Sequence, residues 1–315
     1  MNSSTQQRLA NIIIDSSIIT ISSVNVCLSI GLFGLISCSL FKRKHALNQV
    51  ALLLTANLYL AMFIFSVLLL DQHIYALLGR LSSFPPFTNR IRCQTRAYLL
   101  LVSVSGIYYS NAIQSIYRLC RVVFYTNRSL QSIHLYTILV IILWTMCFVM
   151  KLPTLLLGYF QYSANDYHCQ VEYTNFRIVP VNVFWDYFLP MLITIGCYVY
   201  TLKKTRRNNH NLMQTMTQIE QISARRDMIV LSRICILLGL LLSIFLPSIV
   251  VLFVKLSIGY LPWWSSQIQW FIFSLIITCI IIVLAIVFPH IRYLWKRNSH
   301  REDPKPLRLA IVRID

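Results

Sequence analysis

The chain contains few charged residues. Only 12% of its 315 residues are Asp, Glu, Lys or Arg, 57% are hydrophobic, and just 10 residues are acidic. Soluble domains of this size usually carry about 25% charged residues. The low charge argues against a soluble globular protein. The chain also lacks a sequence repeat and a low-complexity segment.

The chain instead contains long hydrophobic runs. A run of roughly 18 residues or more is long enough to cross a hydrocarbon core as a helix. The first run is too long for the core of a signal peptide, so we interpret it as a span. We predict an all-α membrane protein, a seven-transmembrane helix bundle with spans near residues 17–41, 49–70, 95–117, 135–158, 181–202, 229–254 and 268–291.

The basic residues are distributed unevenly around these spans. Most of the 28 Lys and Arg residues follow spans one, three and five or lie in the tail. Loops rich in Lys and Arg usually stay in the cytoplasm. We therefore predict a plasma-membrane protein whose N-terminus lies outside the cell. The net charge of +18 then reflects topology and contact with membrane lipid, not nucleic-acid binding. The predicted parts are an extracellular segment (1–15), a seven-transmembrane domain (16–297) and a cytoplasmic tail (298–315).

Two further features follow from this orientation. Asn2 begins an Asn-Ser-Ser sequon outside the membrane and is a predicted glycosylation site. Of the nine cysteines, only Cys93 and Cys169 face the oxidising side. We therefore predict a disulfide between them. Two unpaired extracellular thiols are the alternative.

Several residues in the predicted spans stand at characteristic distances from one another. Arg118 follows Cys93 by 25 residues, and Tyr198 follows Pro190 by eight. Other motif-like positions are Trp144 and Pro153 in span four, Phe245 and Pro247 in span six, and Pro289 in span seven. In this joint pattern the chain resembles the rhodopsin-like (class A) G-protein-coupled receptors.

The chain also departs from the family pattern. Tyr117 replaces the acidic residue before the motif arginine, Asn57 stands where the family usually has a sodium-binding aspartate, and Phe288 replaces the asparagine before Pro289. These changes leave the resemblance in fold intact. They imply weak or absent sodium binding and altered switching.

The resemblance implies a switch at the inner end of span three. Arg118 would pair with Asp227 of span six in the inactive state and turn toward Tyr198 and a heterotrimeric G protein in the active state. The simpler interpretation is that Arg118 anchors a helix end at the membrane surface, as many basic side chains do.

The resemblance also implies an extracellular ligand in the outer half of the bundle. The candidate pocket residues are Arg96, Leu100, Val104, Asp186 and Phe245. Leu100 stands where amine receptors carry an aspartate, so a biogenic amine is not expected. Asp186 is an acid inside a span, which points to function, although another helix could equally satisfy it. The aromatic loop around Cys169 favours a peptide over a small molecule.

A secondary transporter is the alternative function, since the spans contain some charges, mainly Lys151, Asp186 and Arg233. Transporters usually show an internal repeat, which this chain lacks. The seven histidines form no metal-ligand pattern. We therefore predict no catalytic residue, no metal and no cofactor, and not an enzyme.

Overall fold

The computed structural model describes residues 3–42, 46–82, 90–124, 127–163, 167–171 and 179–212, short stretches between 239 and 259, and residues 264–287. The described part is helical apart from one hairpin. The helices are α1 (Ser3–Lys42), α2 (Ala46–Ser82), α3 (Arg90–Val123), η1 (Arg128–Gln131), α4 (Ile133–Leu156), α5 (Val179–Val183), the π-helical turn η2 (Phe184–Phe188), α6 (Leu189–Leu212) and α8 (Ser265–Val287). The strands β1 (Phe160–Ser163) and β2 (His168–Val171) pair antiparallel.

Six helical segments in the described part of the chain are long and apolar enough to cross a membrane. They are Gln6–Leu40, Gln49–Ser82, Arg90–Val123, Ile133–Leu156, Val179–Lys204 and Ser265–Ile286. Each contains most or all of one predicted span. The remaining predicted span, 229–254, falls on residues that are described only in part, so the count of seven stays a prediction.

The outer surface of these helices is strongly apolar. On α4 alone, Ile141 is 61% exposed, Val149 57% and Leu156 75%. A soluble protein rarely exposes so large a contiguous apolar surface, whereas lipid chains cover one at no cost. Helix length and surface together identify a multi-pass membrane protein.

Two helices are longer than the apolar runs predicted. α1 begins at Ser3, and α2 continues to Ser82, 12 residues past the predicted end of its span. Most of the segment 1–15, expected to precede the first span, is thus part of α1. The two extensions support each other, because Asp15 and Arg80 form a buried ion pair between them.

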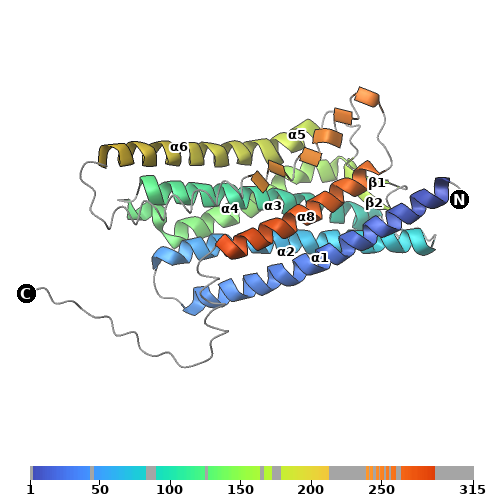
Figure 1. Cartoon of the computed structure of the whole chain (residues 1–315), viewed down its shortest axis with the longest axis horizontal. Helices are drawn as coiled ribbons and strands as arrows, with labels where there is room; N and C mark the ends of the chain where they lie inside the picture. The colour runs from blue at the N-terminus through green and yellow to red at the C-terminus, as the bar shows by residue number, and fades with distance from the viewer. Residues whose placement is uncertain are drawn as a thin grey trace, which may run out of the picture.

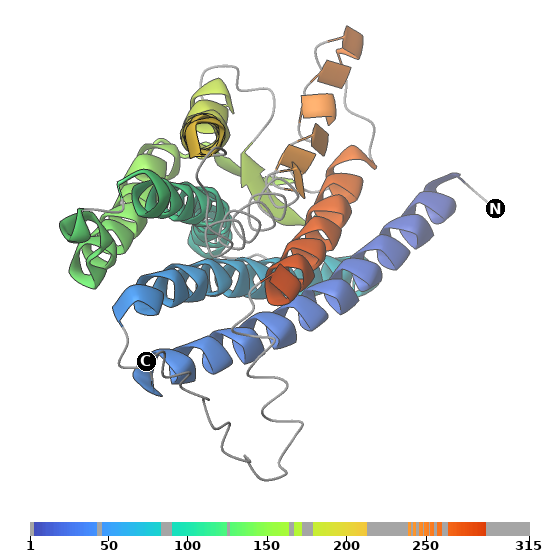
Figure 2. The same ribbon diagram turned by 60° about the vertical axis from the view of Figure 1, so that its left-hand side comes forward.

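The helices run side by side along the long axis of the molecule, as Figure 1 shows. α1 packs against α2 and α8, while α3 packs against α2, α4 and α6. Figure 2 shows the same arrangement of helices from a second direction. α3 is the central helix. Its buried face is rich in polar side chains: Ser103, Ser105, Ser110, Asn111, Gln114 and Ser115.

A glycine turn joins α4 to the hairpin. Gly158 has a φ of 71°, a backbone conformation that favours glycine, and its N–H donates to the carbonyl of Leu155. The chain then reverses into β1, where Tyr162 lies opposite Cys169 of β2. The hairpin lies at the same end of the bundle as the N-terminus of α1 (Figure 1), and we call this the hairpin end.

Candidate functional site

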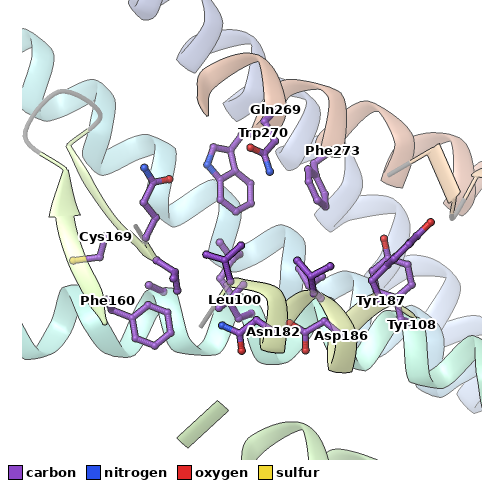
Figure 3. Close-up of a pocket in the computed structure, with 17 residues that line it drawn as sticks. Leu100, Tyr108, Phe160, Cys169, Asn182, Asp186, Tyr187, Gln269, Trp270 and Phe273 are labelled. Carbon is purple, nitrogen blue, oxygen red and sulfur yellow. The ribbon is translucent and has the colours of Figure 1, made fainter. Parts of the chain in front are cut away.

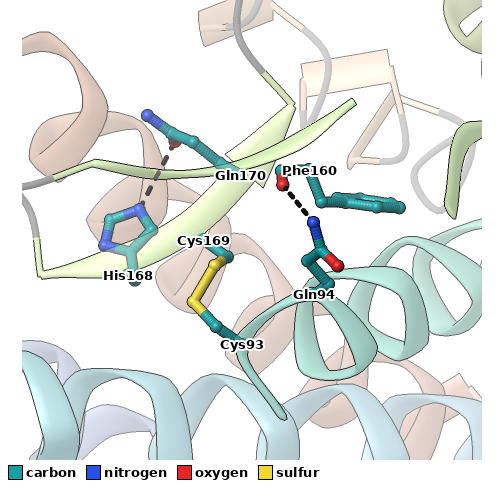
Figure 4. Close-up of a disulfide and its surroundings, with 6 residues drawn as sticks. All are labelled: Cys93, Gln94, Phe160, His168, Cys169 and Gln170. Carbon is teal, nitrogen blue, oxygen red and sulfur yellow. Dashed lines mark hydrogen bonds between the residues drawn. A yellow bond between two sulfur atoms is a disulfide. The ribbon is translucent and has the colours of Figure 1, made fainter. Parts of the chain in front are cut away.

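The hairpin is fixed to the first turn of α3. Cys93 and Cys169 form the predicted disulfide, with their Cα atoms 5.5 Å apart. Both cysteines are buried, and Gln94 Nε2 donates to the carbonyl of Phe160 at 3.1 Å. Figure 4 shows these two links holding β1 and β2 over the end of α3. The other cysteines that the structure describes are free.

A cavity of about 160 Å³ lies beneath this hairpin. Figure 3 shows its labelled side chains converging from α3, the α5–η2 segment, α8 and the hairpin. Most of the lining is aliphatic or aromatic, and few of its groups are polar. The lining comprises Ala97, Leu100, Leu101, Val104, Tyr108, Phe160, Cys169, Gln170, Val171, Val179, Asn182, Val183, Asp186, Tyr187, Gln269, Trp270 and Phe273.

Of the five predicted pocket residues, three line the cavity: Leu100, Val104 and Asp186. Arg96 does not line it: its Nε lies 2.9 Å from Asp71 Oδ2, and its guanidinium stacks over the Tyr75 ring. Arg96 therefore faces α2, where an acid and an aromatic ring are available to it. Phe245 lies outside the described residues.

Asp186 is the acidic group of the cavity, and it is held on both carboxylate oxygens. Ser105 Oγ donates to Oδ1 at 2.7 Å, and Lys151 Nζ forms an ion pair with Oδ2. Lys151 also donates to Asn182 Oδ1 at 2.9 Å. The Lys151 side chain is only 1% exposed and does not line the cavity. The network joins α3, α4 and the α5–η2 segment.

The π-helical turn determines where Asp186 points. Pro190 has no N–H, and in a regular α-helix its ring would meet the carbonyl of Asp186, four residues earlier. Instead, the N–H of Leu189 donates to the carbonyl of Phe184, five residues earlier, as in a π-helix. Such local turns occur frequently at functional sites. In this protein the π-helical turn places the carboxylate of Asp186 between α3 and α4.

Sequence reasoning missed most of the lining and the role of Lys151. Tyr108 and Tyr187 pack edge to face, with ring centroids 5.5 Å apart, and Trp270 lies 5.7 Å from Phe273. The available signal was the presence of a lysine and an aspartate in adjacent spans. A charge inside a membrane span needs an opposite charge or a polar group.

Two of the predicted switch residues, Tyr117 and Arg118, lie at the end of α3 opposite the hairpin. Tyr117 is buried, and its ring packs edge to face on Tyr136 of α4 at 5.1 Å. Arg118 is half-buried, and its Nη1 is buried without a hydrogen-bond partner among the described residues. Tyr198 on α6 and Pro247 are also half-buried. Three further predicted residues, Asn2, Asp227 and Pro289, lie outside the described part of the chain.

Asn57 has a structural role that its sequence position did not predict. Its Nδ2 donates to Ser110 Oγ at 2.7 Å, and its Oδ1 accepts from Trp144 Nε1 at 2.9 Å. Gly106 lets the Trp144 ring approach α3, because a Cβ at that position would lie 3.1 Å from it. Asn57 thus links α2, α3 and α4 and uses both ends of its amide in doing so.

A second buried polar network lies at the hairpin end, between α1, α2 and α8. Asp15 accepts from Arg80 Nε at 2.8 Å and lies 2.9 Å from His73 Nδ1. With the Gln267 amide oriented to satisfy both neighbours, its Nε2 donates to Asp15 at 3.0 Å and its Oε1 accepts from Arg80 at 2.8 Å. This network stabilises the long ends of α1 and α2.

Comparison with models of known protein families gives no match, and comparison with curated proteins gives none either. The geometry of the cavity and of α3 is therefore the basis for the functional proposal.

Proposed function

We propose that this multi-pass membrane protein is a G-protein-coupled receptor of the rhodopsin-like type. In this proposal an extracellular ligand enters the cavity at the hairpin end, and a heterotrimeric G protein binds at the opposite end. One observation carries the proposal: a single central helix, α3, contributes to both places. Leu100 and Val104 line the cavity, and Arg118 lies at the far end with a buried nitrogen that lacks a partner among the described residues.

The distance between the two places supports signalling along a helix. Arg118 lies 10 residues after Tyr108, the lining residue of the cavity that is nearest to it along α3. At a rise of about 1.5 Å per residue, this separation is roughly 15 Å along the helix axis. A ligand in the cavity cannot reach Arg118, so any effect there must pass through a movement of the helices.

The state of Arg118 supports a switch. A buried donor without a partner costs about 1–3 kcal/mol, and more when it is charged. A conformation or protein that offers an acceptor to Arg118 is favoured by that amount. Asp227 would supply the acceptor in the inactive state and a G protein in the active state.

The test compares two arginines of α3. Arg118→Ala should abolish ligand-dependent nucleotide exchange on the G protein and change ligand affinity by no more than a few-fold. Arg121→Ala is the matched control, because Arg121 lies three residues later and is exposed. Equal loss in both variants, or full signalling in Arg118→Ala, would contradict the proposal.

The proposed inactive state, with Arg118 paired to Asp227, has its own test. Asp227→Asn keeps the shape of the side chain and removes its charge. If the pair with Arg118 forms, losing about 1.4 kcal/mol from the inactive state raises ligand-independent exchange about tenfold. Unchanged basal exchange at equal surface expression would mean that Arg118 has another partner.

A secondary transporter is the second candidate. The observation in its favour is the presence of two ion pairs inside the membrane-spanning helices: Asp15–Arg80, which is buried, and Lys151–Asp186, in which Lys151 is buried and Asp186 is 15% exposed. Buried charges of this kind can serve ion or proton coupling. Ligand-dependent binding of a G protein to the purified chain would favour the receptor, and its absence together with ligand uptake into proteoliposomes would favour the transporter.

A further inference from the structure

The cavity combines an apolar lining with a carboxylate whose charge is already compensated. Several of its wall residues are buried: Leu100 is 3% exposed, Tyr108 4% and Trp270 9%. Lys151 approaches Asp186 from behind the wall and neutralises it without entering the cavity. A ligand therefore meets a site with no net charge from this pair.

We infer that this cavity binds a small uncharged molecule of about the size of one aromatic ring, and that Lys151 enforces this selectivity. The inference deepens the proposed function, because it names the ligand class of the proposed receptor. It differs from the expectation of a peptide ligand, which rested on the aromatic residues around Cys169 and stays a separate prediction.

The volume sets the size of the ligand. An apolar cavity of roughly 150 Å³ holds one benzene molecule, and this cavity measures about 160 Å³. The hairpin forms one wall of this volume, because Phe160 of β1 and Gln170 and Val171 of β2 line it. The disulfide and the bond from Gln94 to Phe160 hold that wall in place. One ring fits between these walls, and any longer part of a ligand would lie outside them.

The ion pair sets the charge of the ligand. A cationic ligand would lose its hydration shell on entering and find Asp186 already paired with Lys151. An anionic ligand would also lose its hydration shell and would find no cation among the described lining residues, since Lys151 lies behind the wall. Transfer of an ion into an apolar site is unfavourable unless an opposite charge is available there. A neutral hydroxyl or amide needs only a hydrogen bond, and Asp186, Asn182 and Gln269 place polar groups on the lining.

The selectivity of the wild-type chain is testable with three probes of one shape. The probes are 4-fluorobenzyl alcohol, 4-fluorobenzylamine and 4-fluorobenzoate, which are neutral, cationic and anionic at pH 7. Binding to the full chain in nanodiscs is measured by fluorine NMR, with empty nanodiscs correcting for uptake into lipid. We expect the alcohol to bind at least tenfold more tightly than either ion. Equal or tighter binding of an ion overturns the inference, and so does absence of alcohol binding at millimolar concentration.

Two variants assign the selectivity to the ion pair. Lys151→Met leaves Asp186 without its cation, so benzylamine should bind at least tenfold more tightly than to the wild type, with alcohol binding little changed. The double variant Lys151→Met/Asp186→Leu removes both charges and should still prefer the alcohol. It also covers the case in which the single variant does not fold, because replacing a buried ion pair by apolar side chains is often neutral for stability. Unchanged exclusion of benzylamine in a folded Lys151→Met protein refutes the role of Lys151.

Val104→Phe controls for the location of binding, because Val104 lines the cavity and a larger ring there fills it. Alcohol binding should fall at least tenfold while thermal unfolding shows that the variant is folded; full binding would place the probe elsewhere and overturn the inference. None of these measurements uses a G protein. Loss of the probe preference with intact nucleotide exchange rejects the ligand class alone, and the reverse result rejects the receptor alone.

Discussion

Removing the charge of Asp15 should destabilise the helix bundle far more than removing the charge of Asp71. Both aspartates lie near the hairpin end and each pairs with an arginine. Asp15 Oδ2 lies 2.8 Å from Arg80 Nε, and the two side chains are 0% and 4% exposed. Asp71 Oδ2 lies 2.9 Å from Arg96 Nε, but these side chains are 37% and 26% exposed. The two pairs thus have nearly the same length and differ in burial.

Burial determines the expected magnitude. Removing one partner of a buried ion pair costs about 3–5 kcal/mol, because the other charge stays buried and uncompensated. An exposed pair contributes about 0–1 kcal/mol. Asp15→Asn leaves Arg80 without its carboxylate and also weakens the contact to His73, so we expect a loss of about 3 kcal/mol or more. Asp71→Asn should cost less than about 1 kcal/mol.

The assay is equilibrium unfolding of the purified chain by SDS in mixed micelles, followed by circular dichroism. The double variant Asp15→Asn/Arg80→Gln removes both charges and should recover part of the loss, since no ion is then left buried. Equal free-energy changes for Asp15→Asn and Asp71→Asn would refute the reasoning. It would mean that water reaches Asp15 and Arg80 despite their burial.

Three further predictions concern the disulfide, the helix contacts and the topology. Cys93→Ser should lower surface expression and ligand binding, while Cys27→Ser, which changes a free and exposed cysteine, should leave both unchanged; mass mapping that finds the Cys93 thiol free in the wild type would contradict this. Gly106→Leu should destabilise the bundle by about 1–3 kcal/mol in the same SDS assay, because the new side chain overpacks the contact with the indole of α4; an unchanged unfolding midpoint would show that the indole can move away. An epitope tag at Met1 should be stained on intact cells and a tag after Asp315 only on permeabilised cells, and the opposite pattern would reverse the orientation.

The sequence alone determined that the chain is a multi-pass membrane protein and that Cys93 pairs with Cys169. Long apolar runs exceed the length of a membrane crossing, and this property depends on composition rather than on contacts between helices. The pairing of Cys93 with Cys169 followed from the positions of the spans, because the predicted topology brings no other cysteines to that side. Leu100, Val104 and Asp186, which the resemblance placed in a ligand pocket, all line the cavity; that a ligand binds there stays a prediction.

Only the tertiary structure decided which charges meet. Lys151 and Asp186 are 35 residues apart on different helices, and their contact depends on how each helix is rotated about its axis. A π-helical turn before Pro190 sets that rotation for Asp186, and hydrophobicity alone does not predict such a turn. Arg96 shows the same limit: it lies one turn from Leu100 on α3, yet it turns to Asp71 on α2 instead of the cavity. Periodicity gives the face of a helix, but the choice between polar partners on neighbouring helices depends on packing.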